Sequence, residues 1–149
     1  MTKAPAEILL FSSVAINAAL LIFIAGVLRR VMNDMDESAF KLFVVSLVRH
    51  SKKSPFMVII LNIPLIGAVP YFYFYGFGNR WLICGLALWL AAGVVAKTIK
   101  LPIYKTVATL DVADVARLRE ERHKLNAGNI LQAVLNSVAT ILISVPFFR

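Results

Sequence analysis

The sequence predicts an all-α integral membrane protein, an antiparallel four-helix bundle with short amphipathic helical extensions on the cytoplasmic side. Hydrophobic residues make up 60% of the 149 residues and charged residues only 16%, against about 45–50% and about 25% in soluble domains. The apolar residues gather in four stretches long enough to cross a bilayer, and most basic residues flank those stretches. Residues 1–149 are therefore expected to form a single membrane domain.

The first predicted span, residues 8–28, is the clearest of the four. It contains no charged residue, and at about 1.5 Å per residue it crosses a hydrocarbon core of about 30 Å. A cleaved signal peptide is the alternative interpretation. The basic residues of a signal peptide should precede its apolar stretch, whereas Arg29 and Arg30 follow this one, so a membrane span is favoured.

Aromatic residues surround the turn between the second and third predicted spans. The second span covers residues 55–77 and contains Pro64 and Pro70, which predict a kink in its helix. Aromatic rings favour the headgroup region, and they cluster between Tyr71 and Trp81. The turn is therefore expected at a membrane interface.

The third predicted span, residues 81–103, is long enough only if it continues past two lysines. Lys97 and Lys100 are expected to extend their amines toward the headgroups. Pro102 marks the expected end of this helix, because proline cannot donate a backbone hydrogen bond. The fourth predicted span, residues 127–148, carries several polar side chains, and a span of that kind needs protein neighbours.

Charge asymmetry predicts the orientation. The two connections at residues 29–54 and 104–126 and their flanks hold most of the basic residues, which are Arg29, Arg30, Lys41, Arg49, Lys52 and Lys53 for the first and Lys97, Lys100, Lys105, Arg117, Arg119, Arg122 and Lys124 for the second. Both connections are therefore expected in the cytoplasm and both termini outside, in a plasma or bacterial-type inner membrane. The net charge of +8 is then a signal of topology rather than of nucleic-acid binding.

Both basic connections are expected to be helical. In residues 29–54, Asp34 or Asp36 can cap a helix whose apolar residues recur at helical spacing. This helix is expected either to lie in the interface or to extend the second span. In residues 104–126, Asp111 can cap a helix that continues into the fourth span.

The most informative pattern is a line of polar residues along this last helix. Its members recur every three or four residues, which keeps them on one helical face. They are Arg122, Asn126, Asn129, Gln132, Asn136 and Thr140. An unpaired amide in lipid costs several kcal/mol, so this face must contact protein, a ligand or a cavity. Asn17 in the first span and Asn62 in the second are candidates for the opposing groups.

Two interpretations of this line remain open. In the first, the amides hold helices together, each hydrogen bond contributing about 0.6 kcal/mol. In the second, they line a polar pocket for a small amphipathic ligand, with Arg122 and His123 near its cytoplasmic mouth. Histidine exchanges protons near neutral pH, so His123 is the candidate catalytic residue. The alternative is that His123 is a solvated loop residue.

The sequence favours few other kinds of chemistry. His50 and His123 are far apart in the chain, and Cys84 is the only cysteine, so neither a metal site nor an internal disulfide is expected. No phosphate-binding loop and no common hydrolase motif is found. We expect no cofactor. The expected partners are the lipid bilayer, a small hydrophobic ligand and further copies of the chain, and no nucleic acid.

Three segments resemble the small four-span proteins related to anthrone oxygenases, a family known largely as a domain of unknown function. They are KLPIYKTVATLD, LREERHKLNAGNILQAVLNSVA and AGVLRRVMNDMDESAF. Pro102 and Asn126 fit the pattern of that family, whereas Tyr104, Arg122 and Asn129 stand where it leads us to expect Asn, Trp and Arg. The resemblance implies a related pocket and, for the activity, cofactor-independent oxidation of a small aromatic or other hydrophobic substrate.

Two further classes of function remain open. One is a non-catalytic membrane component, either a self-associating bundle or an accessory subunit whose amide face packs against a partner. The other is a small oligomeric channel or exporter. The channel is less favoured, because the spans lack the rings of charged side chains that many ion pores carry.

Overall fold

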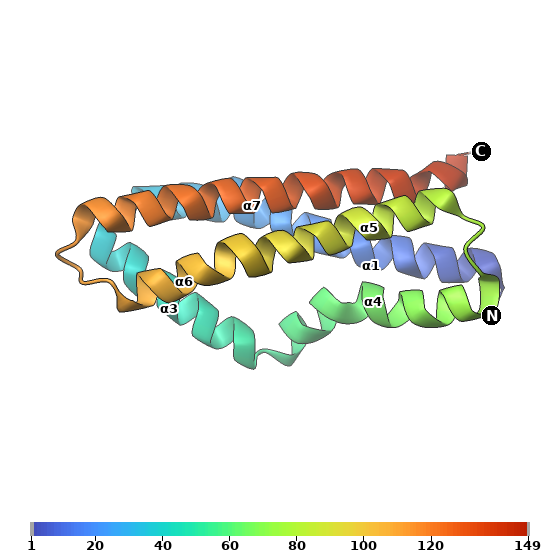
Figure 1. The fold of residues 1–149 in the computed structure, drawn as a ribbon, viewed down its shortest axis with the longest axis horizontal. Coiled ribbons are helices and arrows are strands. Elements are labelled where there is room, and N and C mark those ends of the chain that lie inside the picture. The colour runs from blue at the N-terminus through green and yellow to red at the C-terminus, as the bar shows by residue number, and fades with distance from the viewer. Residues whose placement is uncertain (1, 149) are drawn as a thin grey trace.

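Four long helical segments form the bundle. The computed structural model describes residues 2–148, and within them four segments are long and apolar enough to cross a membrane. Figure 1 shows how these segments are arranged. The elements in chain order are α1 (Lys3–Phe23), η1 (Ile24–Leu28), α2 (Arg29–Asp34), α3 (Glu37–Lys53), α4 (Pro55–Tyr75), α5 (Arg80–Val95), η2 (Ala96–Lys100), α6 (Leu101–Thr109), α7 (Val115–Ser144) and η3 (Val145–Phe148). The predicted all-α, four-span membrane bundle is confirmed.

Three of the four segments are longer than a membrane span requires. The helix is continuous over Lys3–Asp34, over Arg80–Thr109 and over Val115–Phe148, with 32, 30 and 34 residues. At about 1.5 Å per residue these segments are about 45–51 Å long, whereas a hydrocarbon core is about 30 Å thick. The fourth, α4, has 21 residues and matches the core. The three longer segments therefore exceed the thickness of a hydrocarbon core by about 15–21 Å.

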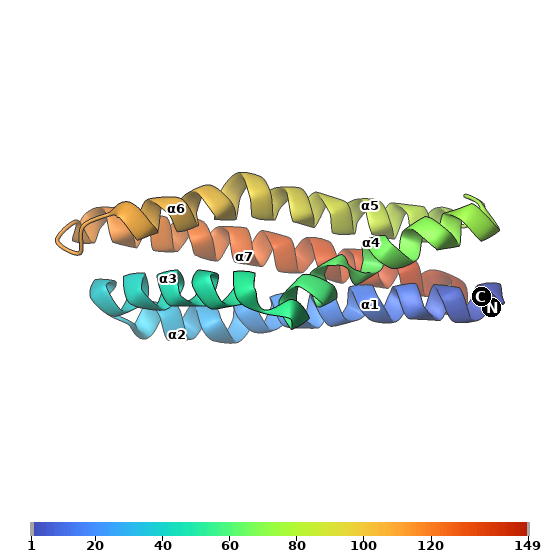
Figure 2. The same ribbon diagram turned by 90° about the horizontal axis from the view of Figure 1, so that it is seen from below.

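The two ends of the bundle differ. Both chain ends lie at the end where the turn of residues 76–79 joins α4 to α5, as Figures 1 and 2 show, and we call it the terminal end. The opposite end holds the α2–α3 junction and the turn of residues 110–114, and we call it the basic end. The extensions α2, α6 and the start of α7 belong to the basic end, with α3 packed against α6 and α7.

The apolar core is divided into two clusters. The terminal cluster joins α1, α4, α5 and α7 through Leu10, Val14, Ala68, Tyr71, Leu82, Leu86, Ala139 and Ile143. The basic-end cluster joins α2, α3, α6 and α7 through Met32, Phe40, Val44, Ile103, Val107, Leu110, Leu118 and Leu125. On α7 the polar residues from Asn126 to Asn136 lie between the two clusters.

The helix predicted in the first connection is α3. The carboxylate of Asp36 accepts a hydrogen bond from the backbone N–H of Ala39 at 2.7 Å, so the predicted cap at Asp36 is confirmed. Phe40 and Val44 are buried in the basic-end cluster. The amine of Lys41 also donates a hydrogen bond to the carbonyl of Leu110. Helix α3 is thus a packed fourth helix of the basic end.

Two predicted helix boundaries were wrong. The third segment does not end at Pro102 but continues to Thr109. The π-helical turn η2 precedes the proline, with the N–H of Leu101 donating to the carbonyl of Ala96, and this wider winding accommodates a residue that cannot donate. Helix α7 begins at Val115 instead of directly after Asp111. The carboxylate of Asp111 accepts from Ala113 N–H at 2.9 Å and stabilises the turn instead.

Two other predictions concern how helices continue. Helix α4 runs from Pro55 to Tyr75, so Pro64 and Pro70 do not end it. The kink expected near these prolines stays a prediction. The prediction that the helix of the last connection continues into the fourth span is confirmed by α7.

Candidate functional site

The candidate site, which we call the polar layer, is the group of buried polar side chains that lies between the two apolar clusters and reaches into the basic-end cluster at Arg122. Its members are Asn17, Lys100, Arg122, Asn126, Asn129, Gln132 and Asn136. Helix α7 supplies five of them, from Arg122 to Asn136. Steps of three and four residues keep these five on the face that also carries Leu118, Leu125 and Ile143. The polar layer therefore interrupts an otherwise apolar helix face.

At the basic end, the polar layer joins α7 to the α2–α3 junction. The guanidinium of Arg122 donates to the backbone carbonyls of Met35 at 2.9 Å and of Asp36 at 3.2 Å. Its central carbon lies 4.5 Å from the centre of the Phe40 ring, within the range of a cation–π contact. One turn further along, Asn126 donates to the side-chain oxygen of Asn33 at 2.8 Å. These contacts hold α7 against the α2–α3 junction.

At its centre, the polar layer contains a buried lysine. The amine of Lys100 donates to the side-chain oxygen of Gln132 at 2.8 Å, and only 7% of the residue is exposed. Its aliphatic stem packs against Gly128, where an added Cβ would lie 3.2 Å from Lys100 Cγ. The prediction that Lys100 extends its amine toward the headgroups was wrong. Because the helix continues past Pro102, Lys100 lies on the bundle side and finds an acceptor on α7.

Asn17 connects α1 to α4. Its side-chain N–H₂ group donates to the carbonyl of Ser13 at 2.9 Å and to the carbonyl of Ile60 at 2.8 Å. Asn62 does not share in this contact, because its side chain is exposed and donates to Val58 in its own helix at 2.7 Å. The group on α4 that meets Asn17 is therefore a backbone carbonyl, which sequence spacing does not reveal.

Three amide oxygens of the polar layer are buried without a hydrogen-bond partner among the described residues. They belong to Asn126, Asn129 and Asn136. A buried acceptor without a donor costs about 1–3 kcal/mol, so native proteins usually supply a donor from protein, water or ligand. Asn129 and Asn136 lie one turn to either side of Gln132, the acceptor of Lys100. The centre of the polar layer therefore has two acceptors without a donor, on the same face of α7 as the acceptor of Lys100.

The polar layer carries positive charge without a carboxylate. The ion pairs of residues 2–148 all lie near the ends of the bundle and involve Lys3, Arg119 and Lys124. An isolated charge away from water is costly. The electrostatics of the polar layer hence favour a polar molecule that brings an acidic or electron-rich oxygen to Lys100.

The remaining residues predicted for the site lie at the margins of the polar layer or outside it. Thr140 is partly buried and donates to the Asn136 carbonyl at 2.8 Å. His123 and His50 are exposed on α7 and α3, and the structure does not bring them to the buried amides. Among the described residues, no group of three or more His, Cys, Asp or Glu side chains could hold a metal ion.

Sequence reasoning missed Lys100, although a signal was present. The sequence does not reveal that Lys100 meets Gln132 on a neighbouring helix. A charged residue inside a predicted span is unusual, however, and this was the signal. Comparisons of the chain with protein families, with curated proteins and with solved structures find no match. The resemblance to anthrone oxygenases therefore stays a prediction from the sequence.

Proposed function

We propose that this four-span membrane protein binds a small amphipathic or aromatic molecule at the centre of its polar layer, beside Lys100, Asn129, Gln132 and Asn136. The observation that carries the proposal is the pair of buried, unpartnered amide oxygens of Asn129 and Asn136 next to the Lys100–Gln132 hydrogen bond. A ligand that donates to these oxygens would remove their desolvation cost. His123 and Asn62 are exposed, so we leave both outside the proposed site.

The groups present define the chemical class of the ligand. Amide oxygens require O–H or N–H donors, and the Lys100 ammonium requires an acceptor, preferably an anionic or phenolic oxygen. The apolar clusters on either side fit a hydrophobic body. A hydroxylated aromatic molecule meets all three requirements. The oxidation implied by the anthrone-oxygenase resemblance would convert a CH₂ group of such a molecule to C=O with dioxygen, releasing water.

The alternative is a non-catalytic membrane component, and specific contacts favour it. Arg122 and Asn126 are used to join α7 to α2 and α3, and Asn17 joins α1 to α4. If the centre of the polar layer served the same purpose, its amides would stabilise the bundle itself. The two functions therefore differ in what Asn129 and Asn136 contribute to stability.

A variant that replaces both Asn129 and Asn136 by leucine distinguishes ligand binding from the non-catalytic role. We expect the variant to keep its thermal midpoint in detergent, because leucine carries no oxygen that needs a partner. We also expect its affinity for the ligand to fall about tenfold for each lost hydrogen bond of about 1.4 kcal/mol, so that less of the molecule co-purifies. Mass spectrometry of the organic extract of purified protein measures the loss. Asn62→Leu, at an exposed position, is the matched control. A clean wild-type extract together with a destabilised variant would instead support the non-catalytic role.

We also propose the orientation in which the basic end faces the cytoplasm. The basic side chains gather at this end, and cytoplasmic loops carry the excess of Lys and Arg. A reporter that is active only outside the cytoplasm should be active when fused after residue 149 and inactive when inserted in the turn of residues 110–114. The reverse pattern contradicts the proposed orientation.

A further inference from the structure

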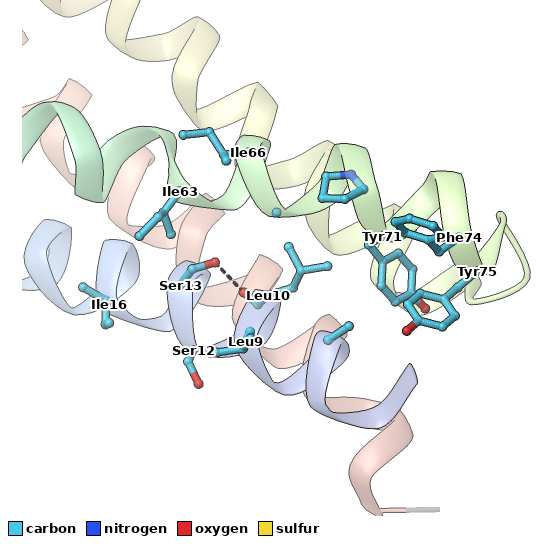
Figure 3. A pocket seen from close by; sticks show the side chains of 13 residues that line it. Leu9, Leu10, Ser12, Ser13, Ile16, Ile63, Ile66, Tyr71, Phe74 and Tyr75 are labelled. Carbon is cyan, nitrogen blue, oxygen red and sulfur yellow. Dashed lines mark hydrogen bonds between the residues drawn. The ribbon is translucent and has the colours of Figure 1, made fainter. Parts of the chain in front are cut away.

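A membrane-facing groove lies between α1 and α4 in the terminal half of the bundle, away from the polar layer. Its volume is about 570 Å³, within the range of small-molecule sites. Figure 3 shows the side chains that line it, with Leu9 and Ile16 on α1 and Ile63, Ile66 and Phe74 on α4. Its lining is almost wholly apolar.

The length of the groove matches one leaflet of a bilayer. From Ile63 to Phe74 the helix rises about 16 Å, and half of a hydrocarbon core is about 15 Å. Helix α1 approaches α4 closely at Gly67, where an added Cβ would lie 3.0 Å from Leu10 Cδ2. The small side chains of Ser12 and Ser13 leave the groove open on the α1 side.

Polar and charged groups lie beyond the terminal end of the groove. Tyr71, which lines the groove, donates from its hydroxyl to the carboxylate of Glu7 at 2.6 Å, and Asn79 donates to the same oxygen at 2.9 Å. Glu7 and Asn79 in turn line a second hollow together with Lys3 and Arg80. The groove and this hollow therefore meet at the Tyr71–Glu7 hydrogen bond.

The second hollow favours an anion. It contains Lys3, Arg80 and a single acid, Glu7, which is already engaged by Tyr71 and Asn79. Lys3 Nζ is 3.9 Å from the Glu7 carboxylate, a long ion pair in which the lysine side chain is half exposed and that of Glu7 is partly buried. Helix α5 begins at Arg80, so the positive end of its dipole adds to the field. The two basic side chains, next to an apolar groove, supply charged donors that a lipid phosphate can accept from.

We propose that the groove between α1 and α4 holds an acyl chain of an anionic phospholipid, whose phosphate is bound by Lys3 and Arg80. The apolar part matches one leaflet in length, the basic part lies at headgroup level, and Tyr71 and Tyr75 lie between them as interfacial aromatic residues do. A second copy of the chain is the competing occupant. It would cover the apolar groove but would not need the basic residues.

The test uses the full-length protein in detergent, with phosphatidylglycerol and phosphatidylcholine added in equal amounts and retained lipid counted by native mass spectrometry. We expect the wild-type chain to retain phosphatidylglycerol about tenfold better than phosphatidylcholine. The double variant Lys3→Gln and Arg80→Gln should lose this preference. The matched control, Lys52→Gln with Lys53→Gln, removes two charges from α3 and should keep it.

A second variant tests the groove itself. Ser12→Leu fills part of the groove and should lower the retention of both lipids, whereas Ile141→Phe, at an exposed apolar position on α7, should not. Equal retention of the two lipids by the wild-type chain would overturn the proposal. So would a dimer that Ser12→Leu abolishes, because this result would assign the groove to a second copy. The polar-layer variant with leucine at 129 and 136 should bind phospholipid normally, which keeps the two proposals separable.

Discussion

Replacing Gly85 by alanine is expected to destabilise the bundle by about 3 kcal/mol, the upper part of the usual range for overpacking. Helices α5 and α7 pack closely at this residue. An added Cβ would lie 2.4 Å from Ile143 Cγ1 and 2.8 Å from the carbonyl oxygen of Ala139. Ile143 can change its rotamer, but the carbonyl of Ala139 can move only if the helix moves. The terminal cluster, which includes Ile143, would then lose its close packing.

The same helix offers a control for this prediction. An added Cβ at Gly93 meets nothing within 4 Å, so Gly93→Ala should leave stability unchanged or raise it by up to about 1 kcal/mol through the better helix propensity of alanine. Thermal unfolding of both variants in one detergent, followed by circular dichroism, measures the difference. Equal midpoints for Gly85→Ala and Gly93→Ala would contradict the close approach of α5 and α7.

Replacing Arg122 by leucine is expected to cost about 2 kcal/mol and to loosen the basic end selectively. The change leaves the carbonyl of Met35 without the Arg122 donor and removes the cation over Phe40. The carbonyl of Asp36 loses one of two donors and keeps the N–H of Phe40 at 2.9 Å. Each lost partner costs about 1–3 kcal/mol where water cannot replace it, and Asp36 is exposed enough for water to restore part of the loss. Hydrogen exchange should therefore accelerate in the first turns of α3 and remain slow in α5.

Arg119, one turn earlier on α7, provides the comparison. Its guanidinium donates to Glu37 at 2.7 Å, and its side chain is 65% exposed. This hydrogen bond, together with the nearby positive charge, holds the pKa of Glu37 below its ordinary value. Exposed ion pairs contribute little to stability, so Arg119→Leu should leave the exchange rates of α3 nearly unchanged. If both arginine variants behaved alike, the burial of Arg122 would have no special importance.

The parts of the fold that sequence predicts are those that depend on one helix at a time. Four apolar stretches predict four spans because each must satisfy its own backbone in lipid. The spacing of Asn129, Gln132 and Asn136 predicts a shared face because helical geometry fixes it. The cap at Asp36 is similarly local. None of these three predictions requires knowledge of the neighbouring helices.

The parts that sequence does not predict depend on how helices meet. Pro102 was expected to end a helix, but packing of α6 in the basic-end cluster and the π-helical turn before it carry the helix onward. That continuation decides whether Lys100 faces headgroups or the bundle. Asn62 was expected to oppose the polar line of the last helix, but its side chain is exposed and donates within α4, which offers the Ile60 carbonyl to Asn17 instead. For both Lys100 and Asn62, packing against neighbouring helices decides which way the side chain faces.

The division of the core into two clusters implies that the two halves of the molecule are stabilised by different forces. The terminal cluster lies among lipid chains, which are as apolar as its own side chains, so close packing is what favours its assembly. In the proposed orientation the basic-end cluster lies beyond the hydrocarbon core, where its formation would expel water. The large heat-capacity change that accompanies the exposure of apolar surface to water should therefore come from the basic end. Temperature and urea act most strongly on that half, while lipid composition acts on the other.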